Sequence, residues 1–316
     1  MSFYENVFVN VGIMIIIAQG VYVLTGLTGL FSLGQSSFVA VGAYTAGMLA
    51  TRYGLNPYLC VLAGMAAAVV VSFIIGLPSL RLRHVYFSLA TIAYCYALQS
   101  VLTVSQYFGG SIGLVGIPTL TRWWHVLGAM ALTVFVVRNF KLSRFGLACL
   151  SVRTDEVAAQ TYGIKVFATK QMAFSLASAI SVLAGGLLAF NLGYLSPDMF
   201  SVPISSEYLI MVFFGGLYSQ TGAVAGTAVL TLLMELLRTA AAWRMIAYST
   251  IILIVILLRP MGLFGTWELS ARGLARLGQS GHFMLFGPGG PNGLTGPAKS
   301  ASPRSRNTKD EVRHDG

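Results

Sequence analysis

Apolar residues in this chain form long continuous runs instead of alternating with polar ones. Residues 7–24, for example, read VFVNVGIMIIIAQGVYVL, and comparable runs recur as far as about residue 259. About 20 consecutive apolar residues suffice for an α-helix to cross a membrane. A membrane β-barrel would require short segments with strict alternation. The pattern therefore predicts an all-α fold, that of a polytopic helical membrane protein.

We expect about nine transmembrane helices, within a range of about eight to ten. The seventh run is short, and GGLYSQTG at 215–222 is also compatible with a re-entrant turn, which would change the count. The expected spans are residues 7–25, 31–50, 57–77, 85–106, 122–140, 171–192, 205–217, 222–242 and 245–259.

Basic residues concentrate in three regions between or after these runs. Arg81 and Arg83 share one short loop, the connection 141–170 holds several more, and Arg259 begins a third group. Because cytoplasmic loops carry the excess of Lys and Arg, all three regions are expected in the cytoplasm. The N-terminus is then outside, together with three loops: 51–56, 107–121 and 193–204. Four arginines depart from this arrangement: Arg52, Arg122, Arg238 and Arg244.

Composition supports a membrane protein and divides the chain in two. Hydrophobic residues make up 56% of the chain and charged residues 9%, whereas a soluble domain has about 25% charged residues. Residues 1–265 are expected to form the transmembrane domain, and the Gly/Pro-rich residues 266–316 a disordered cytoplasmic tail. The net charge of +10 does not predict nucleic-acid binding, because basic residues in membrane loops fix orientation and contact anionic lipid.

No residue set typical of enzymes is apparent, and the first five apolar runs lack the acids that ion-coupled carriers use. No Ser-His-Asp set and no metal-ligand spacing is visible, so we predict neither a catalytic nor a metal site. No acidic residue occurs between Glu5 and Asp155, although intramembrane acids are what proton relays use. This favours a passive channel, or a permease driven by a partner, over a self-powered carrier.

An adjacent acid pair appears in LSVRTDEVAAQTYGI, residues 150–164. This stretch lies in the connection 141–170, which is far longer than an ordinary loop. We expect a short helix there, capped by Thr154 and ended by Gly163. Asp155 and Glu156 suit the positive end of its dipole, and the small pair Ala158–Ala159 would leave a flat face for another protein.

RTDEVAAQTYGI resembles the EAA-type coupling loop of ABC importer permeases, although a Val interrupts its Glu-Ala-Ala run and no Leu-Pro follows. This variant is similar to the branched-chain amino-acid permease family (LivM/LivH type). Other segments resemble the same family in the same order, over about residues 10–265. They are GLTGLFSLGQSSFVAVGAYTAGML (26–49), LRLRHVYFSLATIAY (80–94), GGSIGLVGIP (109–118), YLSPDMFSVPISSEYLIMVFFGGLYSQTGAVAGT (194–227) and LRPMGLFG (258–265).

The resemblance implies an ABC importer permease fold and a transport subunit that is not itself an enzyme. It implies a multi-pass protein of the bacterial inner membrane that translocates branched-chain or related amino acids. The expected partners are a second homologous permease, two ATPase subunits that hold ATP and Mg²⁺, a periplasmic or lipid-anchored binding protein, and membrane lipid; no cofactor is expected in this chain. The residues expected to couple to the ATPase are Arg153, Asp155, Glu156, Ala158, Ala159 and Gly163.

Polar residues near two predicted spans are candidates for the substrate path, because polar groups in a membrane face protein or water. Ser36 and Ser37 have an alternative role as helix caps, and Glu207 has one at the membrane edge. The glycines of GGSIGLVGIP permit unusual backbone conformations and suit either binding-protein docking or a plain connector. The candidates are Ser32, Gln35, Ser36, Ser37 and Glu207.

Other functions remain compatible with the same residues. The nearest alternative is a urea or short-amide permease of the same family. A stand-alone channel or secondary carrier would transport without an ATPase, and a structural or assembly subunit would have no polar path near Gln35.

Overall fold

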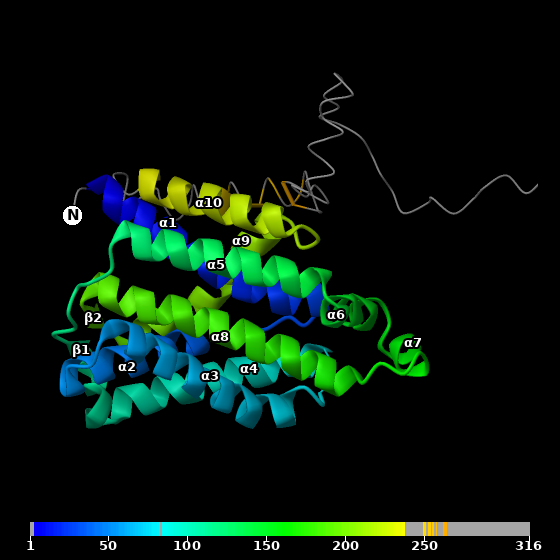
Figure 1. The fold of residues 1–316 in the computed structure, drawn as a ribbon, viewed down its shortest axis with the longest axis horizontal. Helices are drawn as coiled ribbons and strands as arrows, with labels where there is room; N and C mark the ends of the chain where they lie inside the picture. The colour runs from blue at the N-terminus through cyan, green and yellow to red at the C-terminus, as the bar shows by residue number, and fades with distance from the viewer. Residues whose placement is uncertain are drawn as a thin grey trace, which may run out of the picture. The chain divides into compact units, whose positions relative to one another are not determined.

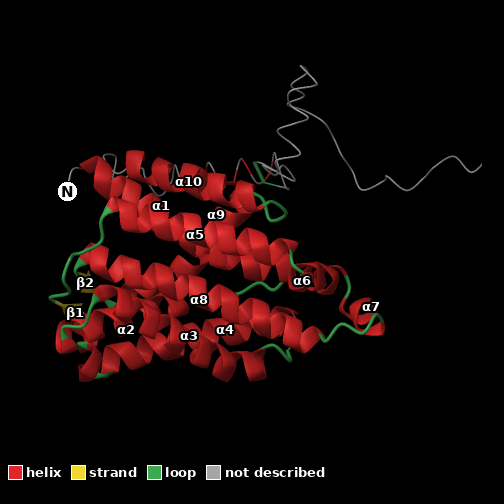
Figure 2. Cartoon of the chain, viewed as in Figure 1, coloured by secondary structure: helices red, strands yellow, loops and turns green. Residues whose placement is uncertain are grey.

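A computed structural model describes residues 3–82 and 84–237, together with 249, 250, 252, 253, 255, 257, 262 and 263. The described part is almost entirely helical, with two very short strands (Figure 2), which confirms the all-α prediction. Its main helices are α1 (Phe3–Val21), α2 (Gln35–Tyr53), α3 (Pro57–Ser79), α4 (His84–Val104), α5 (Trp123–Leu142), α6 (Arg144–Thr154), α7 (Glu156–Thr161), α8 (Val166–Leu192), α9 (Val202–Gly215) and α10 (Gln220–Leu236).

Shorter elements join these helices. A π-helical turn, η1 (Tyr22–Leu27), extends α1, and 3₁₀ turns η2 (Gln106–Phe108), η3 (Gly110–Ile112) and η4 (Pro197–Phe200) lie in the connections. Strands β1 (Leu114–Val115) and β2 (Tyr194–Leu195) pair antiparallel, with Leu114 opposite Leu195.

Five helices of the described part are long and apolar enough to cross a membrane, and a bent pair would make a sixth. The expected count of about nine is higher for three identifiable reasons. Polar residues at both ends of α2, such as Gln35 and Arg52, lower its hydropathy. Helices α9 and α10 are joined by a 119° bend, which agrees with the re-entrant alternative for 215–222. The expected span 245–259 and the tail 266–316 lie mostly or wholly outside the described residues.

The connections gather at opposite ends of the helices, as the basic residues predict (Figure 1). The N-terminal end of α1 lies at the same end as the β1–β2 pair, and there Arg52 donates a hydrogen bond to the carbonyl of Tyr107 at 2.8 Å. Helices α6 and α7 lie at the other end, where the Arg81 guanidinium is 5.9 Å from the centre of the Phe167 ring. We call these the external and the cytoplasmic end, after the orientation that the basic residues predict.

Helices α2 and α8 cross with their backbones in contact. A β-carbon at Gly42 would overlap the carbonyl oxygen of Val182, and one at Gly185 would overlap that of Val39. Small residues permit such close packing between membrane helices. Gly42 and Gly185 therefore permit this contact, and α8 forms the centre of the bundle with α2 and α3 against it.

Two connections run through the interior of the bundle instead of over its surface. Residues 29–34 between η1 and α2 are not helical, and α2 begins at Gln35 beside Ser181, near the middle of α8. The chain also enters the bundle after β2, because Phe200 is buried and accepts a hydrogen bond from Ser36. The expected external loop 193–204 is therefore not a surface loop throughout, because its second half packs against the start of α2.

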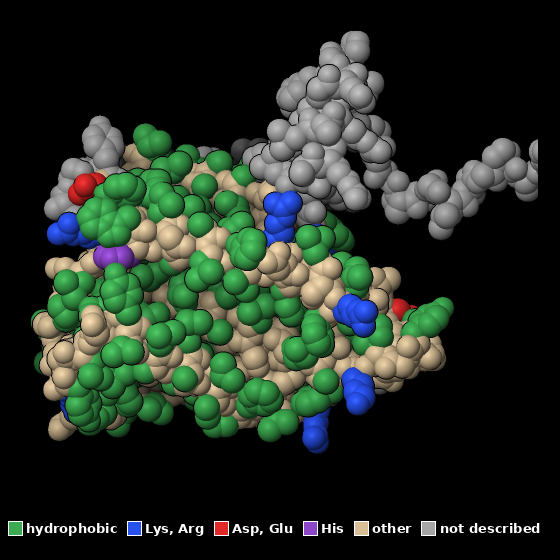
Figure 3. All heavy atoms as spheres, viewed as in Figure 1, with side chains coloured by type: hydrophobic (Ala, Val, Ile, Leu, Met, Phe, Trp, Pro, Cys, Tyr) green, Lys and Arg blue, Asp and Glu red, His purple; other side chains and the backbone are tan. Residues whose placement is uncertain are grey.

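Burial separates the helices into an inner and an outer group. Within their most apolar windows, 72% of the residues of α1 and of α8 are buried, against 28%, 22% and 17% for α3, α4 and α5. Hydrophobic side chains are spread over the whole face shown in Figure 3, and Lys and Arg lie toward its margins. The outer helices therefore offer apolar surface to lipid or to another membrane subunit.

Replacing Gly42 by Ala tests the α2–α8 contact, with Gly128→Ala as its control. Alanine at 42 would meet the backbone of α8 and lower the stability by about 1–3 kcal/mol. Alanine at 128, which has open space around it in α5, should leave stability unchanged or raise it by up to about 1 kcal/mol. The measurement is Tm in detergent. Equal shifts in Tm for both variants would contradict close packing of α2 on α8 at Gly42.

Candidate functional site

The coupling segment, residues 141–170, folds as two short helices at the cytoplasmic end (Figure 1). Helix α6 begins where the Ser143 hydroxyl accepts a hydrogen bond from the Gly146 amide at 3.3 Å. One face of α6, carrying Gly146, Cys149 and Val152, is buried against the rest of the chain. Burial raises the pKa of the Cys149 thiol to about 12, so this thiol stays protonated at neutral pH. The segment is therefore a packed part of the molecule.

Helix α7 is separate from α6 because Asp155 adopts an extended backbone conformation between them. One oxygen of its carboxylate accepts hydrogen bonds from the amides of Val157 and Ala158, at 2.8 and 3.1 Å. The predicted cap at Thr154 is wrong, because its hydroxyl donates to the Leu150 carbonyl within α6. Asp155 is the better cap, since its carboxylate also meets the positive end of the helix dipole.

The C-terminal boundary of α7 is where the sequence places it. Gly163 has a φ of +79°, a left-handed conformation that glycine adopts without steric cost. The Ile164 amide donates back to the Ala159 carbonyl at 3.1 Å, which closes the end of the helix. The predicted role of Gly163 as the helix stop is confirmed.

The outward face of α7 differs from the predicted pair of alanines. Ala159 is buried with Val152, Ile164 and Val166, so only Ala158 of the pair remains partly exposed. The exposed apolar side chains are instead those of Val157, which is 71% exposed, and Tyr162, which is 86% exposed. The small size of Ala159 lets α7 pack closely onto its own chain.

Glu156 points to α8. Its Oε1 lies 2.5 Å from the Nζ of Lys170, and the Lys170 side chain is 5% exposed while that of Glu156 is 31% exposed. A buried ammonium is stable only with a partner, so this ion pair fixes α7 to the cytoplasmic end of α8.

Arg153, the last basic residue of α6, also points into the bundle. Its guanidinium donates a hydrogen bond to the Gly26 carbonyl of η1 and lies 4.3 Å from the centre of the Tyr218 ring. Tyr218 belongs to the bend between α9 and α10. Of the predicted coupling residues, Arg153 and Glu156 thus bind within the chain.

A polar cluster surrounds the N-terminal ends of α2 and α9, deep in the bundle. The Ser36 amide donates to the Ser205 hydroxyl at 2.9 Å, and the two hydroxyls are 2.6 Å apart. The Ser36 hydroxyl lies 3.0 Å from the Phe200 carbonyl and 3.3 Å from the Cys95 sulfur. Ser36 therefore binds the η4–α9 connection and does not cap its own helix.

The neighbouring candidates lie in the same region. The Ser181 hydroxyl donates to Gln35 Oε1 at 3.2 Å, and Ser32 accepts from the Gly34 amide at 3.4 Å. The Ser37 hydroxyl has no hydrogen-bond partner within the described part of the chain. Ser32, Gln35, Ser36 and Ser37 are all at most 1% exposed, so they lie inside the protein and not along an open channel. Glu207, in the second turn of α9, is partly exposed.

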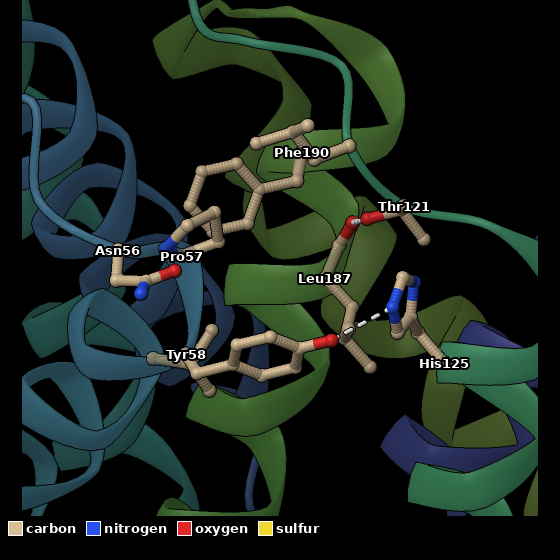
Figure 4. A pocket seen from close by; sticks show the side chains of 9 residues that line it. Asn56, Pro57, Tyr58, Thr121, His125, Leu187 and Phe190 are labelled. Atoms are coloured by element: carbon tan, nitrogen blue, oxygen red, sulfur yellow. Dashed lines mark hydrogen bonds between the residues drawn. The ribbon is translucent and has the colours of Figure 1, made fainter.

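A pocket of about 330 Å³ opens at the external end between α3, α5 and α8 (Figure 4). The Tyr58 hydroxyl is 2.8 Å from Nε2 of His125 at its edge, and Thr121 donates to the Leu187 carbonyl. Its walls are mostly apolar, and the polar side chains among them are those of Asn56, Tyr58, Thr121 and His125. The lining residues are Asn56, Pro57, Tyr58, Val61, Leu120, Thr121, His125, Leu187 and Phe190.

The sequence is similar to those of known membrane transport proteins. Residues 3–259 match the protein family described as branched-chain amino acid transport system / permease component. The chain belongs to this family. It is therefore a transport permease subunit of a membrane-embedded complex and not an enzyme.

Individual relatives agree with this family. The high-affinity branched-chain amino acid transport system permease proteins LivM of Salmonella typhimurium and Escherichia coli are each 28% identical over 287 residues. That alignment covers 79% of this permease and 67% of each relative. A probable branched-chain amino acid transport permease protein LivH of Methanocaldococcus jannaschii is 24% identical, over 84% of this permease and 92% of that protein.

Three residues of the permease that the sequence did not single out complete these contacts. They are Lys170, Ser205 and Tyr218, the partners of Glu156, Ser36 and Arg153. For Lys170 the sequence does hold a signal, because a Lys at the start of a long apolar run needs a partner of opposite charge. Nothing in the sequence indicates the other two pairings, because their members lie 169 and 65 positions apart.

A double-mutant cycle tests the ion pair that fixes α7. Glu156→Gln and Lys170→Met should each lower the stability of the permease by about 1–3 kcal/mol, and the double variant by less than the sum. The reason is that each single change leaves one group without its partner. Tm in lipid nanodiscs is the measurement, and Lys165→Met, at an exposed lysine, is the control. Additive losses in the double variant would show that the pair contributes no coupling energy.

Proposed function

We propose that this permease is one of two permease subunits of an ATP-driven importer for branched-chain amino acids in the bacterial inner membrane. Family membership supports the reaction class. The observation that carries the proposal is the exposed pair Val157–Tyr162 on α7, a helix that Asp155 caps and Glu156 fixes to α8. Exposed apolar residues on a fixed helix at the cytoplasmic end form a suitable docking surface for a separate ATPase.

The ATPase docks on α7 through Val157 and Tyr162, with Ala158 between them. Two such ATPase subunits hold ATP and Mg²⁺, and this permease holds neither. Asp155, Glu156, Ala159 and Gly163 contribute by shaping and fixing α7, since their side chains or backbones are engaged within the segment. Closure of the ATPase pair on ATP would then push α7.

Further partners follow from the other surfaces. The exposed apolar sides of α3, α4 and α5 contact the second permease or membrane lipid. At the external end, Ile112 is 82% exposed and Val115 is 64% exposed. These two side chains stand on a backbone shaped by glycines with positive φ, such as Gly113, and form a docking point for a periplasmic or lipid-anchored binding protein.

The substrate path passes the polar cluster when α2 and α9 separate. Ser36 and Ser205 lie near the N-terminal ends of two helices, where the helix dipoles favour a negatively charged group. Gln35 and Ser37 add polar groups beside them. Substrate selection depends mainly on the binding protein, and urea or short amides are the alternative substrates to test.

Crossed variants at the two ends test the partner assignment. Val157→Asp should abolish co-purification of the ATPase and retain the binding protein, because a charge in an apolar docking surface is costly to desolvate. Ile112→Asp should do the reverse. Mass spectrometry of the tagged complex from native membranes measures both, and each variant is the control for the other. Retention of the ATPase by Val157→Asp would rule out α7 as the docking helix.

Uptake into proteoliposomes tests the substrate and the energy source. The reconstituted complex should accumulate leucine only with ATP inside, and excess valine or isoleucine should compete. Competition by urea or acetamide alone would replace the proposed substrate with the amide class. Leucine uptake by this permease without any ATPase would instead establish a channel or secondary carrier.

A further inference from the structure

The Arg153 side chain occupies the C-terminal end of the first membrane span. Helix α1 and η1 are continuous from Phe3 to Leu27, and the last carbonyls of any helix lack partners within it. The Arg153 guanidinium donates to one of them, that of Gly26. A cation there also meets the negative end of the helix dipole. The contact is therefore favourable in both hydrogen bonding and charge.

The Arg153 side chain also contacts Gly29, which follows this helix end, and Tyr218 in the bend between α9 and α10. A β-carbon at Gly29, whose φ is +72°, would lie 3.0 Å from Cγ of Arg153. A β-carbon at Gly26 would lie 3.0 Å from the Leu217 carbonyl in the α9–α10 bend. The Tyr218 ring of that bend lies under the guanidinium, an arrangement typical of a cation–π contact. Arg153 thus joins α6 to two separate membrane elements at once.

These two elements run side by side from Arg153 into the bundle. We call residues 29–36 and 205–218 the paired segments. At their cytoplasmic ends, Arg153 bridges Gly29 and Tyr218. Further along, the rings of Phe31 and Phe213 stack with centres 5.8 Å apart and an interplanar angle of 8°.

The paired segments meet again at their inner ends. There the Ser36 and Ser205 hydroxyls are 2.6 Å apart, beside Cys95. Positions 29, 31 and 36 of one segment thus lie beside positions 218, 213 and 205 of the other. The two segments are therefore antiparallel and in contact at three places. A displacement of Arg153 therefore has a continuous packed route to the polar cluster.

We propose that Arg153 is the positioning residue through which movement of the coupling segment separates the paired segments at the polar cluster. Its role is inside the permease and not at the ATPase surface. The inference rests on the proposed function, because it requires that an ATPase moves α6 and α7. Arginine suits the task, because its planar group makes a hydrogen bond and a ring contact together, which a lysine ammonium does not reproduce.

The test follows the reactivity of Cys95 in the complete complex in nanodiscs. Cys60 and Cys149 are replaced by alanine, which leaves Cys95 as the remaining thiol of this chain. The alkylation rate of Cys95 by N-ethylmaleimide is measured by peptide mass spectrometry, without nucleotide and with ATP plus vanadate. With Arg153 present, nucleotide should change the rate by about fivefold or more.

Arg153→Ala should remove this response to nucleotide and lower leucine uptake per ATP hydrolysed, while the ATPase still co-purifies. Arg153→Lys should retain part of the response, because it keeps the charge and loses the planar group. Tyr218→Phe should behave as the unmodified chain, because it keeps the ring. The matched control is Arg144→Ala, which removes an exposed arginine from the first turn of α6.

The outcomes separate this inference from the proposed function. Failure of the unmodified chain to capture any ATPase would overturn the proposed function itself. Capture with an unchanged Cys95 response in Arg153→Ala would overturn the positioning role alone. Loss of ATPase capture in both Arg153→Ala and Arg153→Lys would also overturn it, because Arg153 would then act in docking. A response that is lost in Arg153→Ala and intact in Arg144→Ala supports the proposal.

Discussion

The permease depends on one constraint, which is that a broken backbone inside a membrane must find its hydrogen bonds within the protein. The chain is irregular between η1 and α2 and again between β2 and α9. Helix side chains beside the breaks supply these partners: Thr91 and Ser88 of α4 bind the backbone of Leu33 and Phe31, and Ser36 of α2 donates to the Phe200 carbonyl. The two irregular segments therefore have to lie together. Polar residues within the apolar sequence, such as Ser36 and Ser205, supply the hydrogen bonds that hold the two segments together.

The coupling segment is attached to two different parts of the membrane domain. Glycines bring α2 and α8 into backbone contact, and α3 packs on α8. Helix α1 packs against α8 as well as against α9 and α10. The segment is bound to Lys170 of α8 and to the Gly26 carbonyl of the first span. A force on this segment is therefore applied to the membrane domain at two separate points.

The sequence predicts the features that depend on neighbours along the chain. Apolar runs identify most of the helices, the basic loops predict which connections share an end, and Gly163 marks the end of α7 correctly. It does not predict which of two adjacent candidates caps a helix, because Thr154 has an equally good local use in its bond to Leu150. It also does not predict which alanine faces inward, because the burial of Ala159 depends on the contact with Val166. Pairings such as Ser36 with Ser205 depend wholly on the tertiary fold.

The single extended residue between α6 and α7 has a consequence for how the coupling segment moves. A continuous helix would make both attachments parts of one stiff rod, so that strain at one would appear at the other. Asp155 interrupts the helical hydrogen bonds and leaves two soft dihedral angles at that point. The orientation of α7 relative to α6 is thus set by where each is fastened. Asp155 therefore acts as a hinge between α6 and α7. The angle between the two helices depends on the distance between the Arg153–Gly26 contact and the Glu156–Lys170 ion pair.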